Sequence, residues 1–218
     1  MTNDIVQIKR ALISVFDKSG LAELLGKLDP ARRGIEVLST GGTAKKIAEL
    51  GYAVRDVSNY TGFPESPDDL VKTLHPRVHG SLLMDPSIPA HDKYMQEQGI
   101  LPTDLMVGNL YPFSSAIAKP GATYEDAKKN IDIGGPAMIR AAAKGFKKVA
   151  VLVDWNDLEL ITEHETPNGK VLGTRLADRF RMMQHAFAHT AEYDTAIAGY
   201  LKAQDPEKVA QFYLEGQK

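Results

Sequence analysis

The sequence contains no cysteine among its 218 residues. This absence excludes disulfide bonds, thiol nucleophiles and thiolate metal ligands, and it is compatible with a reducing compartment. No apolar run approaches the ~18 residues that a membrane span requires. The first residues, 1–4, also lack the basic and apolar regions of a secretory signal. We therefore expect a cytoplasmic protein that has no membrane partner.

The sequence also lacks a strong excess of either charge. Its 26 lysines and arginines nearly balance its 28 aspartates and glutamates, which leaves a formal charge of −2, and the basic residues are spread along the chain. A protein that follows a nucleic-acid backbone usually carries a basic stripe. Nucleic acid is therefore not an expected partner.

Short apolar runs recur with helical patterns between them. They lie at 11–16, 35–38, 53–57, 104–110 and 149–153. Strands that alternate with helices predict a parallel sheet covered on both faces. The predicted fold class is α/β, a three-layer α/β/α arrangement with a central, mainly parallel sheet. A length of 218 residues suits one such domain, spanning 1–218.

Two regions differ from this alternating pattern. Proline, glycine and aspartate are frequent from 62 to 89, which predicts an irregular, structured loop over the site. Beyond Thr174 apolar residues recur at helical spacing, and the end after Gln204 is polar. We expect a C-terminal helical element from about residue 174, and we expect it to pack rather than to catalyse.

Polar and glycine-rich segments follow three of the predicted strands. They are 14–20, 39–44 and 109–113. Ligands of parallel α/β sheets bind beyond the carboxyl ends of the strands. The three segments therefore predict one ligand crevice.

The segment Ser-Thr-Gly-Gly-Thr-Ala at 39–44 has the features of a phosphate-binding loop. Glycines allow a tight turn and close approach of the backbone to an anion, and a helix start offers unpaired N–H groups at a positive dipole end. Ser39, Thr40 and Thr43 add hydroxyl groups. The same pattern is also ordinary helix-capping and turn chemistry, so locally both interpretations stay open.

Several unusual strings occur in a characteristic order. They are Ser14–Gly20, Ser39–Ala44, Thr61–Glu65, Val71–Pro76, Asn109–Phe113, Ile131–Gly135, Arg140–Lys144 and Phe187–Asp194. On these strings nearly the whole chain resembles the inosine monophosphate (IMP) cyclohydrolase domain, the N-terminal half of a bifunctional purine-biosynthesis protein. The resemblance implies a fold like that of methylglyoxal synthase, with the phosphate loop at 39–44. The bifunctional relatives continue into a formyltransferase domain, and we expect this chain to be a stand-alone cyclohydrolase.

The resemblance implies a ring closure in the last step of purine synthesis. The carboxamide nitrogen of 5-formamidoimidazole-4-carboxamide ribonucleotide attacks the formyl carbon, and IMP forms with loss of water. The resemblance implies that the reaction needs no cofactor. It also implies that the protein is a homodimer. The reaction joins a poor nucleophile to a poor electrophile, so the site has to hold a near-attack geometry and stabilise a developing oxyanion.

The resemblance marks Lys72 and Tyr111 as catalytic. An ammonium at Lys72 would stabilise the formyl oxygen as it becomes anionic, and the phenol of Tyr111 can donate a hydrogen bond to the same oxygen. From the residues alone, a solvated loop lysine and a half-buried tyrosine with a satisfied hydroxyl are the competing interpretations.

Asp132 and Lys144 complete the expected catalytic group. Asp132 precedes Gly134-Gly135-Pro136, a typical helix start, where it can orient or deprotonate the carboxamide or simply stabilise the helix dipole. Lys144 corresponds to a functional lysine of the family. It lies eight residues beyond Pro136, about 12 Å along a helix. Followed by Gly145, it also fits a C-terminal dipole partner.

The remaining contacts are predicted for substrate binding. Asn109 is expected to meet the base, and free N–H groups near Gly134 are expected to face the ligand. The expected phosphate contacts are Ser14, Lys18, Ser39, Gly41, Gly42, Thr43 and Thr73. His75 and His79 lie four residues apart, but Pro76 argues against a shared helical face, so no metal site is expected.

One departure from the family pattern concerns a ligand-binding arginine. Family members have Gly-Arg before the Val-Lys pair, whereas this chain has Asp69-Leu70. Leucine cannot replace a bidentate phosphate contact. Compensation by Lys18, Arg77 or another cation, a different loop path and weaker affinity all remain open. A non-catalytic phosphate-ligand sensor and a methylglyoxal synthase are the alternative functions.

Overall fold

The computed structural model describes residues 4–64, 71–118, 120–167 and 169–215. Its centre is a five-stranded parallel sheet with the order β4-β3-β2-β5-β6. The strands are β2 (Arg10–Val15), β3 (Glu36–Ser39), β4 (Arg55–Asp56), β5 (Leu105–Asn109) and β6 (Ala150–Leu152). Each coincides with one of the apolar runs, so the predicted α/β class with a parallel central sheet is confirmed.

The position of β2 in the centre of the sheet explains why these runs are apolar at successive positions rather than alternating between apolar and polar residues. Leu12 pairs with Leu38 on one side and with Met106 on the other, and all three are at most 2% exposed. A strand covered on both faces needs apolar side chains at every position. The core therefore lies between the sheet and the helices on its two faces.

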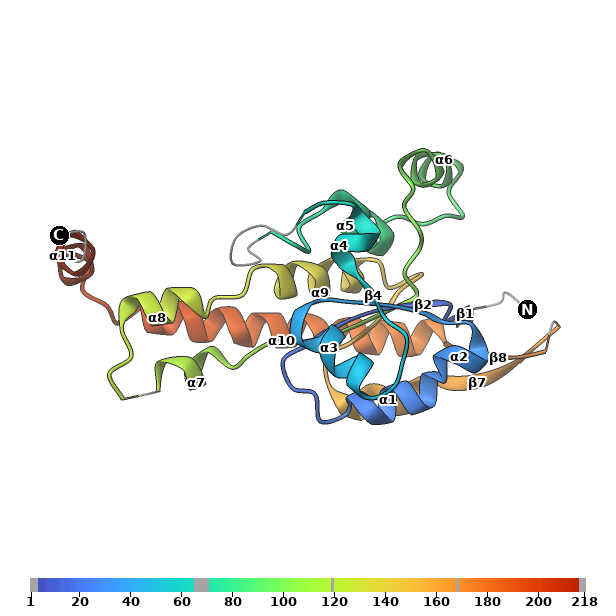
Figure 1. Cartoon of the computed structure of the whole chain (residues 1–218), viewed down its shortest axis with the longest axis horizontal. Coiled ribbons are helices and arrows are strands. Elements are labelled where there is room, and N and C mark those ends of the chain that lie inside the picture. Colours follow the sequence, from blue (N-terminus) through green and yellow to red (C-terminus); the bar gives the residue numbers. More distant parts are fainter. Residues whose placement is uncertain (1–3, 65–70, 119, 168, 216–218) are drawn as a thin grey trace.

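Helices flank the sheet (Figure 1). α1 (Leu21–Leu28) shows why they form, because Leu21, Leu24, Leu25 and Leu28 recur at helical spacing and are fully buried. The other helices of the α/β body are α2 (Pro30–Arg33), α3 (Gly41–Glu49), α4 (Val57–Thr61), α5 (Pro76–Leu83), α6 (Pro89–Gln98) and α9 (Gly134–Lys144).

The predicted irregular loop at 62–89 is wrong in its second half, where the structure has α5. Pro76 occupies the first helical position, and the Nδ1 atom of His75 accepts a hydrogen bond from the N–H of Arg77 at 3.1 Å. A proline at this position loses no intrahelical bond, and an N-cap acceptor satisfies a free N–H. Val78 and Leu82 then bury the inner face of the helix.

A second, smaller sheet was not predicted. It is antiparallel, with the order β1-β8-β7. Its strands are β1 (Val6–Gln7), β7 (Thr162–Thr166) and β8 (Gly169–Thr174), and a short 3-10 helix, η2 (Trp155–Leu160), precedes β7. Strand β7 is polar and largely exposed, and β8 is buried only in its second half, so neither has the continuous buried apolar signal that revealed the central strands.

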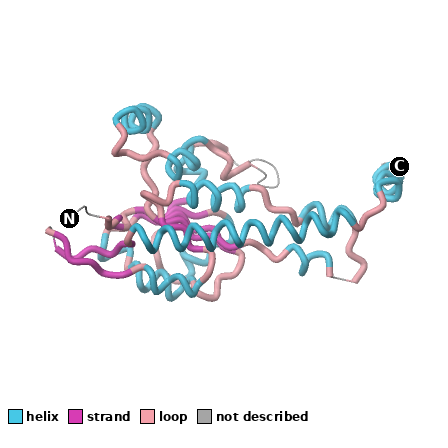
Figure 2. Tube along the Cα trace, turned by 180° about the vertical axis from the view of Figure 1, so that it is seen from behind, coloured by secondary structure: helices cyan, strands magenta, loops and turns pink. Residues whose placement is uncertain are grey.

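The longest element is α10 (Leu176–Lys202). It packs against α9 and β6 and then extends beyond the sheet beside α7 (Phe113–Ile117) and α8 (Tyr124–Lys129), with α11 (Pro206–Glu215) at the far end (Figures 1 and 2). We call this extension, formed by α7, α8, α11 and the C-terminal half of α10, the arm. Within the described ranges, no helix combines the length and the apolar character that crossing a membrane requires.

Candidate functional site

A cavity of about 820 Å³ lies at the carboxyl ends of β2, β3 and β5. The chain order of the sheet reverses between β2 and β5, and such switch points are where open α/β sheets bind ligands. Ser14, Thr40 and Asn109, one from the end of each strand, line this cavity. The three polar segments therefore meet at one crevice, as the sequence predicted.

The cavity gathers most of the predicted site residues. Those that line it are Ser14, Gly41, Lys72, Thr73, Asn109, Tyr111, Asp132 and Gly134. Those that do not are Lys18, Ser39, Gly42, Thr43 and Lys144.

The start of α3 supplies backbone N–H groups to the cavity. Thr40 is the extended N-cap residue, and Gly41 follows with φ +48°. Glycine adopts this left-handed conformation without the strain that a Cβ atom causes. The Thr40 hydroxyl lies 3.4 Å from that of Ser14. Together these donors and the positive end of the helix dipole make the rim suitable for an anion.

Ser39 and Thr43 have a different arrangement from the one predicted. The hydroxyl of Ser39 is fully buried and donates to the Ile13 carbonyl at 2.6 Å. The hydroxyl of Thr43 donates to the Val15 carbonyl at 2.9 Å and accepts from the Val15 N–H at 3.1 Å. Both hydroxyls therefore link the glycine turn to β2. In this way they hold in place the backbone that faces the cavity.

Two cations that were considered as substitutes for the missing arginine are occupied elsewhere. Lys18 Nζ donates to the carbonyls of Val15 and Phe16, and the Arg77 guanidinium contacts the carbonyls of Tyr60, Thr61 and Gln98. Of the described residues, the cations lining the cavity are Lys72 and Lys129. Asp69 and Leu70 lie outside the described residues, as does Glu65.

Lys72 is a buried side chain rather than a solvated one. Its side chain is 8% exposed, and its Nζ atom lies 3.6 Å from Asp56 Oδ2. Asp56 in turn caps α4 by accepting from the N–H of Ser58 at 2.8 Å. A buried ammonium requires a compensating charge, and Asp56 provides it. Sequence analysis missed Asp56, because β4 and the segment around Lys72 meet only in three dimensions.

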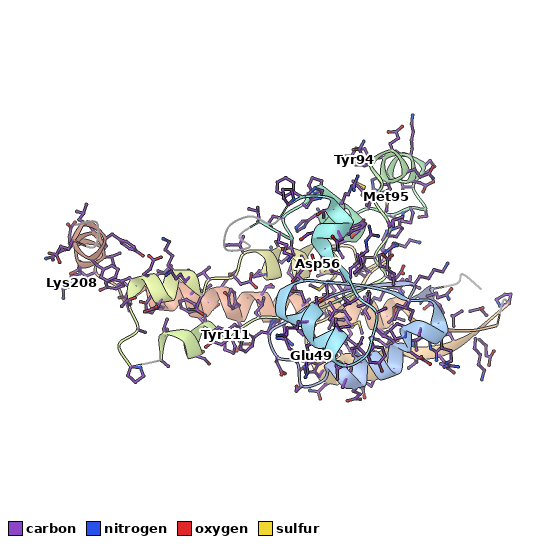
Figure 3. The ribbon with its side chains drawn as sticks, in the orientation of Figure 1. Glu49, Asp56, Tyr94, Met95, Tyr111 and Lys208 are labelled. Atoms are coloured by element: carbon purple, nitrogen blue, oxygen red, sulfur yellow. The ribbon has the colours of Figure 1, made fainter. Side chains whose placement is uncertain are left out.

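Tyr111 lies where the α/β body meets the arm (Figure 3). Its ring contacts that of Phe16, with centroids 4.4 Å apart and planes at 64°. Phe16 is 51% exposed and also lines the cavity. The two rings form an aromatic wall suited to a flat heterocycle.

Asp132 folds back on the start of α9. Its Oδ1 atom accepts from the N–H of Gly135 at 3.0 Å, and a Cβ added at Gly135 would lie 2.3 Å from Asp132 Oδ2. A Cβ added at Gly134 would lie 2.5 Å from Thr73 Oγ1. The two glycines are therefore required for close approach, since they let Asp132 and Thr73 pack on the helix start beside the cavity.

Lys144 does not reach the cavity. It is exposed in the last turn of α9, whose first residue, Gly134, is the one that lines the site. The two residues are ten positions apart, which corresponds to about 15 Å of helix. Within one chain, Lys144 therefore sits at a helix C-terminus, where a cation favours the dipole.

Asn109 lines the cavity, but its side-chain amide makes three hydrogen bonds to the loop after β2. The Oδ1 atom accepts from the N–H groups of Phe16 and Asp17, both at 2.8 Å, and Nδ2 donates to the Asp17 carbonyl at 3.0 Å. Asn109 therefore braces Phe16, which forms the aromatic wall with Tyr111. A direct contact between this amide and a base stays a prediction.

His75 is the extended N-cap residue before Pro76, whereas His79 lies within α5. The N–H of His79 donates to the His75 carbonyl at 3.0 Å. Burial lowers the pKa of both imidazoles, which favours their neutral forms. Among the residues that the structure describes, no group of three or more metal-binding side chains gathers here or elsewhere.

Residues around Asp132 that were not predicted as site residues also belong to the site. Lys129, Asn130, Ile131 and Ile133 line the cavity around Asp132. Their position beside Asp132 in the sequence was the available signal, because a loop that carries one site residue usually places its neighbours close by.

Comparison with known families divides the chain into two matched segments. Residues 20–137 match the MGS-like domain. Residues 142–218 match a family described as the AICARFT/IMPCHase bienzyme. The first segment contains most of the residues that line the cavity, from Thr40 to Gly135.

The chain is also similar to individual proteins. It is 50% identical over 194 residues to the bifunctional purine biosynthesis protein PurH of Neisseria gonorrhoeae and 49% identical to that of Neisseria meningitidis, covering 89% of this chain but 36% of each relative. The crystal structure of ForH matches with a TM-score of 0.70 and 26% identity, over 88% of this chain and 97% of that one. The matched domain spans more than half of the sequence, and the chain belongs to the MGS-like domain family.

Proposed function

We propose that this chain is an IMP cyclohydrolase, which closes 5-formamidoimidazole-4-carboxamide ribonucleotide to IMP with loss of water. The observation that carries the proposal is the convergence of Lys72, Tyr111 and Asp132 on one cavity that begins at the N-terminus of α3. The Neisseria relatives are named as bifunctional purine biosynthesis proteins, which supports the same pathway.

Substrate binding begins at the phosphate. The ribose phosphate is anchored at the start of α3 by backbone N–H groups near Gly41 and by the hydroxyls of Thr40 and Ser14. The imidazole lies against the aromatic wall of Phe16 and Tyr111. Anchoring both ends of the substrate turns the ring closure into a reaction of two groups held in contact.

Ring closure forms a bond between the carboxamide nitrogen and the formyl carbon, while the formyl oxygen gains negative charge. The Lys72 ammonium stabilises that oxyanion, and its burial beside Asp56 strengthens the interaction because little water competes. Asp132 accepts the carboxamide proton through its Oδ2 atom, since Oδ1 already accepts from Gly135. Asp132 then returns this proton to the oxyanion, and the resulting hydroxyl leaves together with the proton of the former formamido nitrogen as water, which creates the C=N bond of the purine ring.

The proposal includes a homodimer in the cytoplasm. A cavity of about 510 Å³ on the arm is lined mostly by apolar and aromatic side chains, including Phe113, Tyr124, Tyr200 and Tyr213. Such an apolar surface is typical of an association site. Light scattering coupled to gel filtration tests this part, with twice the chain mass expected and a monomer as the contradicting result.

The activity is tested by mixing the purified chain with the formylated ribonucleotide and following purine formation by ultraviolet absorbance, with a sample lacking protein as the control. Saturable, protein-dependent formation of IMP supports the proposal. Nucleotide binding without turnover would instead favour a phosphate-ligand sensor. Release of inorganic phosphate from dihydroxyacetone phosphate, without ring closure, would favour a methylglyoxal synthase.

A further inference from the structure

Two side chains of α10 reach the backbone of the loops that line the cavity. The N–H of Leu110 donates to His189 Nε2 at 3.2 Å, and the N–H of Asp132 donates to Tyr193 Oη at 2.7 Å. The same Oη atom donates to the Asn130 carbonyl at 3.3 Å. One helix thereby contacts both walls of the site.

The spacing of these two residues makes the arrangement possible. His189 and Tyr193 lie one helical turn apart, so their side chains project from the same face of α10. Leu110 directly precedes Tyr111, and Tyr193 contacts the backbone of Asp132 itself. The helix therefore fixes the separation of the two segments that carry the aromatic wall and the carboxylate.

The protonation states of the His189 imidazole and the Tyr193 phenol are suited to these hydrogen bonds. His189 can accept from Leu110 only while Nε2 is unprotonated, and burial lowers the pKa of its imidazole, although the carboxylates of Glu192 and Asp154 raise it. Burial likewise raises the pKa of the Tyr193 phenol, which is 6% exposed. Its hydroxyl stays protonated and makes one acceptor and one donor interaction.

We propose that His189 and Tyr193 are positioning residues for the ring closure, and that they act by holding Tyr111 and Asp132 at the separation which the reacting groups require. This inference rests on the proposed function. Neither residue lines the site cavity, so their removal is expected to change the geometry of the walls without removing a substrate contact. A misplacement of about 1 Å is enough to slow an enzyme by up to two orders of magnitude.

The test compares Tyr193→Phe with Tyr200→Phe, the same chemical change on the same helix. Tyr200 packs against Phe113 on the arm and lines the separate apolar cavity. Assays well below the unfolding midpoint should show that Tyr193→Phe lowers kcat by about tenfold or more, with KM within about twofold of wild type. Tyr200→Phe should leave both unchanged. Equal kcat in wild type and Tyr193→Phe would overturn the proposal.

His189 offers a rescue experiment. In His189→Gln an amide oxygen can still accept from Leu110, whereas His189→Leu has no acceptor. Activity should recover to within about threefold of wild type in the glutamine variant and fall by about tenfold in the leucine variant. Equal losses of activity in both variants would contradict a positioning role for the hydrogen-bond acceptor of His189.

Amide hydrogen exchange separates a failure of this inference from a failure of the proposed function. Faster exchange at Leu110 in His189→Leu, and at Asp132 in Tyr193→Phe, is expected whether or not the wild-type chain closes the ring. An inactive wild type would contradict the cyclohydrolase proposal alone. Unchanged exchange at both amides would overturn the positioning role, even in an active enzyme.

Discussion

At the residue scale, the proposed chemistry depends most on the ammonium of Lys72. Lys72→Ala should lower kcat by about a hundredfold or more, because it removes the group that stabilises the oxyanion. The dissociation constant of IMP should change little, since the phosphate anchor is at the start of α3. Steady-state kinetics and calorimetry measure the two quantities.

The matched control for Lys72→Ala is Lys202→Ala, which removes an exposed lysine at the end of α10. It should leave kcat and IMP binding unchanged. An unchanged kcat in Lys72→Ala would contradict the oxyanion role.

The close packing at Gly134 gives a second prediction at this scale. In Gly134→Ala the new methyl group would lie 2.5 Å from Thr73 Oγ1, so the side chain next to Lys72 has to rotate away. We expect kcat to fall by about tenfold. Gly26→Ala, where a Cβ meets no atom within 4 Å, is the control and should keep full activity. Equal activity of the two variants would show that the packing of Thr73 does not matter.

The sequence predicted residue types better than their contacts. Ser14, Lys72, Thr73, Tyr111 and Asp132 all line the cavity, because each belongs to a string whose chemistry is recognisable. Ser39 and Thr43 were assigned to the ligand, but a hydroxyl satisfies an adjacent strand as readily as it binds a phosphate. Whether a hydroxyl binds the strand or the ligand depends on the direction of its side chain. The residue types alone do not determine that direction.

At the scale of the elements, Arg179 joins α10 to its surroundings. It is 2% exposed, and its guanidinium donates to the carbonyls of Asp4, Phe146, Lys147 and Thr174. Arg179→Lys should lower the free energy of unfolding by about 2–4 kcal/mol, since a single ammonium cannot satisfy carbonyls in four directions. Urea denaturation measures the change.

Arg181→Lys is the matched control for this prediction, because Arg181 is exposed on the same helix. Its effect should stay within about 0.5 kcal/mol. Equal effects at both positions would show that the carbonyl contacts of Arg179 contribute little to stability.

The elements themselves were predictable where burial leaves a strong pattern. The five parallel strands lie in or overlap short apolar runs bounded by polar turns, so these runs located them all, although β4 itself is only Arg55–Asp56 within the run at 53–57. Strands β7 and β8 pair with each other, with β7 and the first half of β8 largely exposed, and α5 begins at a proline inside a loop-like composition. Their formation depends on pairing and capping partners, which a local pattern does not reveal.

At the scale of the whole molecule, three histidines link stability to pH. Burial lowers the pKa of His75, His79 and His189 from the ordinary value of 6.5. The unfolded chain therefore binds more protons than the folded chain near and below pH 6.5. The stability from keeping these imidazoles neutral is present above that pH and is lost as the pH falls towards the lowered values.

The melting temperature should accordingly fall between about pH 7 and pH 5.5. Asp104 opposes this trend at lower pH, because burial raises the pKa of its carboxyl, and its contribution declines as the pH rises. Thermal unfolding of wild type and His189→Gln across this range tests the assignment. The glutamine variant should show a smaller fall, and an identical fall would exclude His189 as a contributor.

The central claim is that one cavity holds the nucleotide, with its phosphate at the start of α3 and its reacting ring atoms between Lys72 and Asp132. A crystal structure of the chain with bound IMP tests it most directly. We expect phosphate oxygens on the N–H groups near Gly41 and the purine beside Tyr111. IMP bound elsewhere, or in the reverse orientation with its phosphate at Asp132, would contradict it.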